Sequence, residues 1–142
     1  EVEVLDAQPD EYGYAEFRDI LREKMGDVVG ITAMTFTLID VMKTVKLVKQ
    51  LSPETKVVLG GPHVHVFPEE TINLPGVDFL VQGEGEKTFI QLLDKLHNLD
   101  ALEQVPGLVF VVQSPDRHPD VIEVAINEFL ESYREVLAAM PD

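Results

Sequence analysis

The chain has 142 residues, 45% of them hydrophobic, which is typical of a single globular domain with a buried core. Acidic residues outnumber basic residues 26 to 11, and the resulting formal charge of −15 disfavours binding to nucleic acid or to anionic membrane surfaces. The absence of cysteine excludes disulfides, thiolate zinc sites, iron–sulfur clusters and cysteine nucleophiles from the chain. No apolar run approaches the ~20 residues of a membrane span and no signal peptide opens the chain, so we expect a cytoplasmic location.

The first part of the chain alternates between strand-like and helix-like segments. Residues 1–7, EVEVLDA, alternate charged and apolar side chains and predict a strand over Val2 to Leu5. Apolar residues at helical spacing predict a helix over 14–25 and another over 38–51. Between these helices, DVVGITAM reads as a buried strand that ends in small and hydroxyl residues.

The same alternation continues as far as Pro106, after which the pattern changes. KVVLGG and VDFLVQ are expected strands, PEETINLP allows a short helical turn, and GLVFVV is a further strand. EKTFIQLLDKLHNL predicts an amphipathic helix whose inward residues are Phe89, Leu92, Leu93 and Leu96. A turn-rich loop then precedes a strongly amphipathic helix over 121–140. Because the central strands are apolar on both faces, we expect an α/β fold with a mainly parallel sheet and helices on both sides.

Small and hydroxyl residues gather where three successive strands end. The segments are TAMTFT (32–37), GGPH (60–63) and GEGEKT (83–88). Ligands of open parallel sheets bind outside the carboxyl ends of the strands, and parallel topology brings these three loops to one edge. Their glycines permit close approach of the backbone to a ligand. The pattern therefore favours a broad, flat ligand over three independent turns.

Phosphate-binding loops do not explain GEGEKT. A Walker loop requires glycine before the lysine, where Glu86 stands, and a dinucleotide fingerprint requires a third glycine, where Thr88 stands. Glu84 and Glu86 would repel phosphate and instead suit amide or hydroxyl donors. Their position near a helix N-terminus offers a second explanation, because the macrodipole favours negative charge there.

The histidines and lysines give weaker signals. In an extended segment His63 and His65 would point to the same side, but no third ligand is evident nearby, so a metal site is disfavoured. We expect His63 to line the ligand site, and His97 and His118 to lie on the surface. Three lysines spaced every three residues predict a solvated helix face rather than an anion site: Lys43, Lys46 and Lys49. No catalytic residues are predicted.

Four segments resemble the cobalamin-binding domain of B12-dependent radical SAM enzymes, and most closely the anaerobic magnesium-protoporphyrin monomethyl ester cyclase group. They are DVVGITAMTFT, KVVLGGPHVHVFPEET, VDFLVQGEGEKTFIQLLDKL and VPGLVF. The resemblance covers roughly residues 1–112, and the most specific part is GGPH followed by GEGE after successive strands. It implies a flavodoxin-like (Rossmann-like) three-layer αβα fold with the corrin ring over the strand ends.

The resemblance also implies roles for individual residues. The groove for the nucleotide tail would be lined by Thr32, Ala33, Met34, Thr35 and Thr37. Gly60, Gly61, Pro62 and His63 would pass beneath or beside the corrin, and its amide-bearing rim would meet Gly83, Glu84, Gly85 and Glu86. The Asp-x-His-x-x-Gly motif that ligates cobalt in other cobalamin modules is not matched by DRHPDV, residues 116–121, which has valine in place of glycine.

Departures from the family suggest that the chain is part of a larger enzyme. Family members begin one strand earlier, and the catalytic barrel with its three-cysteine motif is absent here. We expect residues 1–112 to form the cobalamin-binding domain and 113–142 to form a loop and a helix that packs on the domain or leads to a partner. The parent's S-adenosylmethionine and 4Fe-4S cluster would belong to the barrel, and the isolated chain would be inactive.

The closure of the sheet and the function each leave alternatives open. The gap left by the missing first strand can be closed by pairing of the first two strands present, by the Leu108 to Val112 strand, or by a second molecule in a homodimer. The alternative function is a flavodoxin-like interaction module that binds no cofactor, as the missing first strand and the apolar stripe on the last predicted helix suggest.

Overall fold

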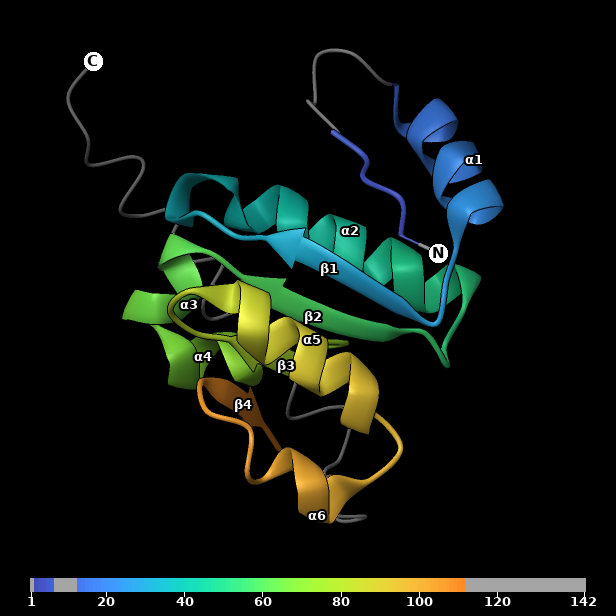
Figure 1. The fold of residues 1–142 in the computed structure, drawn as a ribbon. Coiled ribbons are helices and arrows are strands. Elements are labelled where there is room, and N and C mark those ends of the chain that lie inside the picture. The colour runs from blue at the N-terminus through green and yellow to red at the C-terminus, as the bar shows by residue number, and fades with distance from the viewer. Residues whose placement is uncertain (1, 7–12, 112–142) are drawn as a thin grey trace, which may run out of the picture.

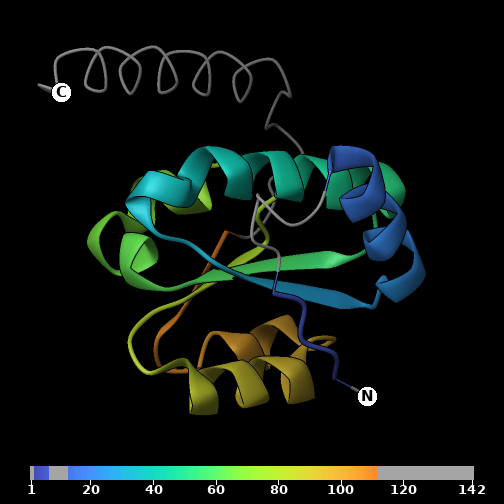
Figure 2. The same cartoon turned by 90° about the horizontal axis from the view of Figure 1, so that it is seen from above.

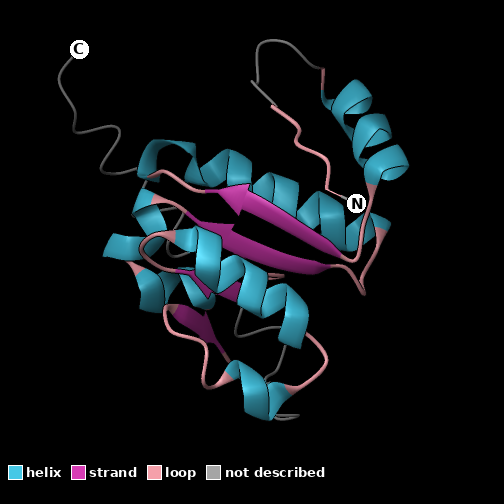
Figure 3. Cartoon of the chain, viewed as in Figure 1, coloured by secondary structure: helices cyan, strands magenta, loops and turns pink. Residues whose placement is uncertain are grey.

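A four-stranded sheet forms the centre of the protein (Figure 1). The computed structural model describes residues 2–6 and 13–111. The strands are β1 (Val28–Thr32), β2 (Lys56–Gly60), β3 (Phe79–Val81) and β4 (Leu108–Phe110), and they lie side by side in that order. β1, β2 and β3 are parallel, whereas β4 pairs antiparallel with β3 at one margin of the sheet (Figure 3).

Helices cover both faces of the sheet. They are α1 (Tyr14–Lys24), the 3₁₀ turn η1 (Thr35–Thr37), α2 (Leu38–Leu51), α3 (Pro62–Val66), α4 (Pro68–Ile72), α5 (Gly85–Lys95) and α6 (Leu99–Leu102). Figure 2 shows α2 on one face of the sheet and α5 with α6 on the other. The predicted three-layer, flavodoxin-like α/β fold with a mainly parallel sheet is confirmed.

Strand β2 is buried on both faces because its side chains alternate between two cores. Val57 and Leu59 belong to the core beneath α2, which also contains Val45 and Val48 of that helix. Val58 points the other way and packs in a second core with Leu92 and Leu102 of α5 and α6, among others. This period of two explains why the strand is a continuous apolar run in the sequence.

The buried stripe of α5 is narrower than expected. Leu92 is fully buried, and Phe89 and Leu96 pack against the same core. Leu93 is 39% exposed, so its predicted inward position is wrong. Successive residues of a helix are rotated by about 100°, and positions 89, 92 and 96 already fill the face toward the sheet.

The predicted strand over Val2 to Leu5 is wrong. Residues 2–6 form no strand, and Val2 and Val4 are exposed while Leu5 packs partly against the α2-side core. Alternation of apolar and charged residues makes a strand only where a neighbouring backbone supplies hydrogen bonds. In the described part of the chain, β1 pairs with β2 alone, and residues 2–6 do not pair with its other edge.

The free edge of β1 is therefore not closed in either of the two intramolecular ways considered. The first two predicted strands do not pair, and β4 lies at the opposite margin of the sheet. β4 covers part of the Leu108 to Val112 segment that was predicted to be a strand. Closure by a second molecule stays a prediction, and the predicted helix over 121–140 lies outside the described residues.

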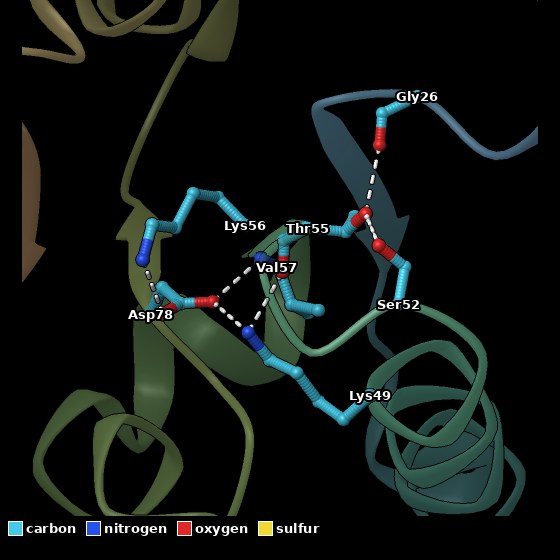
Figure 4. A network of polar contacts seen from close by, with 7 residues as sticks. All are labelled: Gly26, Lys49, Ser52, Thr55, Lys56, Val57 and Asp78. Atoms are coloured by element: carbon cyan, nitrogen blue, oxygen red, sulfur yellow. Dashed lines mark hydrogen bonds and ion pairs between the residues drawn. The ribbon is translucent and has the colours of Figure 1, made fainter.

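A carboxylate organises the amino ends of β2 and β3 (Figure 4). One oxygen of Asp78 lies 2.7 Å from both the backbone nitrogen of Val57 and the Nζ of Lys49, and the other lies 3.7 Å from the Nζ of Lys56. Lys49 also donates to the carbonyl oxygen of Thr55. The prediction that Lys49 belongs to a solvated helix face is thus wrong, since its side chain is only 22% exposed.

Candidate functional site

The three glycine- and threonine-containing loops meet at the carboxyl edge of the sheet, as predicted. Thr32 and Gly60 are paired neighbours at the ends of β1 and β2, and the Ala33 amide donates to the Gly60 carbonyl at 2.8 Å. The loop after β3 begins at Gln82 and leads through Gly83 into α5. Parallel pairing of β1, β2 and β3 brings the three chain ends to one side, where open sheets bind ligands.

Gly61 is a glycine because the neighbouring strand end comes too close for a side chain. A β-carbon on Gly61 would lie 2.9 Å from the carbonyl oxygen of Ala33 and 3.0 Å from a methyl group of Thr32. Its φ of 97° and ψ of −177° fall in a region that is essentially restricted to glycine. The chain's own backbone therefore explains Gly61 without any ligand.

Gly60 and Gly83 are under different constraints. A β-carbon on Gly60 would meet nothing closer than the Val81 carbonyl oxygen at 3.7 Å, an ordinary contact. Gly83 has a φ of +73°, and its β-carbon would meet no atom within 4 Å. The space above Gly83 is therefore free of protein atoms and is available to a ligand.

The residues after GG form a helix, which separates the two histidines. Pro62 occupies the first turn of α3, where its missing N–H costs nothing. The expectation that His63 and His65 point to the same side of an extended segment is wrong, because two helical positions differ by about 200°. His63 is buried at 3% exposure, while His65 is exposed.

His63 connects two of the loops from a buried position. Its Nδ1 lies 3.1 Å from the hydroxyl oxygen of Thr35, and its backbone N–H donates to the Ala33 carbonyl at 3.1 Å. The ring packs against that of Phe67, with 5.3 Å between centroids. Burial lowers the pKa of His63, an effect that the negative charge of Glu70 opposes. The imidazole is consequently kept neutral around pH 7.

An open pocket of about 360 Å³ lies between the loops that follow β2 and β3, and its lining residues are Gly61, Pro62, His65, Val66 and Gly83. Its volume is within the range of small-molecule sites. Residues His65 and Val66 were missed in the sequence because PHVHV was treated as extended. A helical interpretation of the segment, with proline at its first position, would have placed them on the outward side.

The acidic residues lie beside this pocket rather than in its lining. Glu84 is the N-cap of α5 and Glu86 lies in its first turn, and both are exposed. This position agrees with stabilisation of carboxylates by the helix macrodipole. Gly85, at the start of the same helix, is packed more tightly, since its β-carbon would lie 3.1 Å from Val81 Cγ1.

The remaining predicted site residues lie in the loop after β1. Ala33 is fully buried, whereas Met34 is partly exposed, at 39%. The hydroxyl of Thr37 donates to the Met34 carbonyl at 3.1 Å and accepts from its N–H at 3.2 Å, which closes the η1 turn. Thr35 faces His63. The structure thus brings every predicted site residue to one sheet edge, although only Gly61, Pro62 and Gly83 among them line the pocket.

The described residues contain no group of at least three histidine, cysteine, aspartate or glutamate side chains that could hold a metal ion. No helix within the same residues is long and apolar enough to cross a bilayer. The pocket combines a glycine and proline floor with the exposed imidazole of His65. Such a surface can bind and orient a flat ligand, but it offers no nucleophile paired with a base.

Comparison with known proteins identifies a family. Residues 1–93 match the family described as B12 binding domain, which is more than half of the chain. Residues 96–142 match a second family, described as PQQ synthase PqqF-like, C-terminal lobe domain 4. The second match covers the smaller part of the chain.

Several curated proteins are similar over most of the chain. An uncharacterized methyltransferase of Pyrococcus horikoshii is 34% identical over 111 residues, which are 78% of this chain and 24% of that protein. The anaerobic magnesium-protoporphyrin IX monomethyl ester cyclase of Cereibacter sphaeroides is 31% identical, covering 75% and 18% of the two chains. The cobalamin-dependent radical SAM methyltransferase TokK of Streptomyces tokunonensis is 38% identical, covering 58% and 12%.

The chain thus spans about a quarter or less of the length of these relatives. Among solved structures, the N-terminal domain of a hypothetical protein of Thermotoga maritima is similar with a TM-score of 0.47 and 28% identity. That similarity covers 66% of this chain and 70% of the other.

Proposed function

Because the chain belongs to the B12 binding domain family, whose cofactor is cobalamin, we propose that it holds a corrinoid across the pocket between Gly61 and Gly83. The observation that carries this assignment is the free space above Gly83. A β-carbon on Gly83 would meet no atom within 4 Å, and Gly83 lines the pocket together with Gly61 and Pro62. A planar macrocycle needs such open space, whereas a turn alone does not require it.

The residues of the carboxyl edge would hold different parts of the corrinoid. Gly61, Pro62 and Gly83 form the floor, and the exposed side chains of His65 and Val66 flank it. The loop after β1 is proposed to receive the nucleotide tail through the predicted residues Thr32, Ala33, Met34, Thr35 and Thr37. Glu84 and Glu86 are proposed to accept hydrogen bonds from amide groups of the corrin rim.

When bound, the corrinoid supplies a cobalt centre capable of accepting and donating a methyl group. This chain's contribution is binding and orientation. The names of the relatives support a parent enzyme of radical SAM type, a methyltransferase or cyclase, whose barrel would carry S-adenosylmethionine and a 4Fe-4S cluster. Within such an enzyme, residues 1–112 are proposed as the cobalamin-binding domain, and 113–142 as a loop and a helix that packs on this domain or leads to a partner or the next domain. A homodimer formed at the free edge of β1 and a cytoplasmic location stay predictions.

Equilibrium dialysis against hydroxocobalamin tests the proposed function. We expect saturable binding that is weakened about tenfold or more by Gly83→Asn, a change of about 1.4 kcal/mol in binding free energy. Asparagine tolerates positive φ, so this variant should fold while it fills the space above the pocket floor. Gly13→Asn is the matched control, because Gly13 also has open space around its β-carbon but lies at the start of α1.

Absence of binding by the unmodified chain would reject the proposed function. The chain would then fit the cofactor-free interaction module better. Equal affinity in the Gly83→Asn variant would place any bound cobalamin somewhere other than this pocket.

A further inference from the structure

The two histidines of α3 are separated so completely that they cannot have the same role. His63 is 3% exposed and lies between the η1 turn and the ring of Phe67. His65 is exposed and lines the pocket with Gly61 and Gly83. A ligand in the pocket can therefore touch the side chain of His65, whereas the imidazole of His63 is directed at Thr35.

The turn that His63 reaches has few buried side chains of its own. Ala33 before it and Leu38 after it are buried at 0% and 1% exposure, and they anchor its two ends. Between them Met34 is 39% and Phe36 is 75% exposed, so burial holds neither side chain in place. The hydrogen bond between Thr35 and His63 ties the middle of the turn to α3.

The backbone gives this connection a fixed geometry. The N–H of His63 donates to the Ala33 carbonyl, and the His63 carbonyl accepts from the N–H of Phe67 at 2.9 Å. Gly61 also packs closely on Ala33. Movement of the start of α3 away from the end of β1 would therefore break both this packing and the His63–Ala33 hydrogen bond. The imidazole of His63 is thus held by its backbone and by the ring of Phe67 before it meets the hydroxyl of Thr35.

We propose that His63 is a positioning residue, which holds the Met34–Thr37 turn through Thr35 in the conformation that receives the corrinoid and leaves contact with the cofactor to His65. The proposal rests on the proposed function for the identity of the ligand. It assigns His63 no contact with the corrin, in contrast to the role implied by the family resemblance. Loss of the Thr35–His63 hydrogen bond should weaken binding by releasing the turn.

A double-mutant cycle on the full chain tests the coupling. Thr35→Val and His63→Leu should each weaken hydroxocobalamin binding about two- to tenfold, the range expected for one hydrogen bond. The double variant should bind no more weakly than either single variant, because both remove the same interaction. His63→Asn should restore most of the affinity, since its side-chain amide can bond near the position of Nδ1.

His65 supplies the comparison within the same helix. His65→Ala should also weaken binding, but its effect should multiply with that of Thr35→Val, because the two side chains act at different places. Independent, multiplying effects of His63→Leu and Thr35→Val would overturn the proposal. So would a failure of His63→Asn to bind more tightly than His63→Leu.

Hydrogen exchange in the cofactor-free chain separates this proposal from the proposed function. The amide of Thr37, which bonds to the Met34 carbonyl at 3.0 Å, should exchange faster in Thr35→Val and in His63→Leu. Thr44→Val is the matched control, because the hydroxyl of Thr44 bonds only to the Asp40 carbonyl among the contacts described for it, within α2. Unchanged exchange at Thr37 would reject the positioning role even if cobalamin binds. Faster exchange without cobalamin binding would reject the proposed function and retain the link between His63 and the turn.

Discussion

A β-carbon placed on Gly61 would lie 2.9 Å from the carbonyl oxygen of Ala33, closer than such atoms approach in proteins. Packing within the chain therefore explains Gly61 but not Gly60, the last residue of β2. Gly61 allows the end of β1 to pack on the start of α3. Gly60 has room for a methyl group, so the chain itself does not require a glycine there.

This difference predicts opposite stabilities for two alanine variants. Gly61→Ala should lower the free energy of unfolding by about 1–3 kcal/mol from backbone strain alone, with the clash against Ala33 in addition. Gly60→Ala should leave it within about 0.5 kcal/mol. Urea unfolding followed by circular dichroism measures both values. Equal stability of the two variants would contradict the described packing of Gly61. Because Gly60→Ala should fold normally, its affinity for hydroxocobalamin also shows whether a ligand needs the space above Gly60.

The carboxylate of Asp78 should be important for stability, although it lies far along the strands from the pocket. Asp78→Ala leaves the Val57 N–H and the Lys49 ammonium without their shared acceptor, at a cost of about 2–3 kcal/mol. Asp19→Ala is the control, because Asp19 pairs with Arg22 on the exposed side of α1 and such pairs contribute roughly 0–1 kcal/mol. Urea unfolding compares the two. A loss as small in Asp78→Ala as in Asp19→Ala would show that solvent replaces the carboxylate.

The buried imidazole of His63 predicts a pH dependence of stability. Burial holds the pKa of His63 below its ordinary 6.5, so the unfolded chain takes up this proton at a higher pH than the folded chain does. Stability from this source is complete above about pH 6.5 and is lost as pH falls through the folded pKa. His63→Asn should remove that part of the loss of stability as pH falls below about 6.5. An identical decline in the variant would assign the effect to carboxylates instead.

The spacing of apolar residues within single segments was enough to predict helix α2 and the three parallel strands. Helix α2 has the predicted bounds because its apolar stripe extends over several turns. β1, β2 and β3 were found from short apolar runs, and parallel pairing then placed the three loops at one edge. Apolar periodicity and short apolar runs can be recognised within a single segment, without knowledge of its neighbours in the fold.

The rest depends on neighbours that are distant in the chain. Residues 2–6 alternate like a strand but have no partner among the described residues, and the antiparallel direction of β4 is set by the path of the chain through α6. Helix α3 was missed because five residues contain too little of a helical period to distinguish it from an extended segment. That error put His63 and His65 on the same side of the chain, whereas His65 lines the pocket and His63 is buried. Lys49 was misassigned because Asp78, its partner, is 29 residues away.

Amide chemical shifts of the isotope-labelled chain during titration with hydroxocobalamin test the central claim most directly. If the corrinoid lies over the pocket, the amides of Gly61, His65, Val66 and Gly83 should shift and saturate together. The amides of Val57 and Asp78, at the opposite end of the strands, should stay unchanged. No shift at about 1 mM cofactor, where even a weak site of that dissociation constant would be half filled, would contradict the account. Shifts confined to residues outside the carboxyl edge of the sheet would contradict it equally.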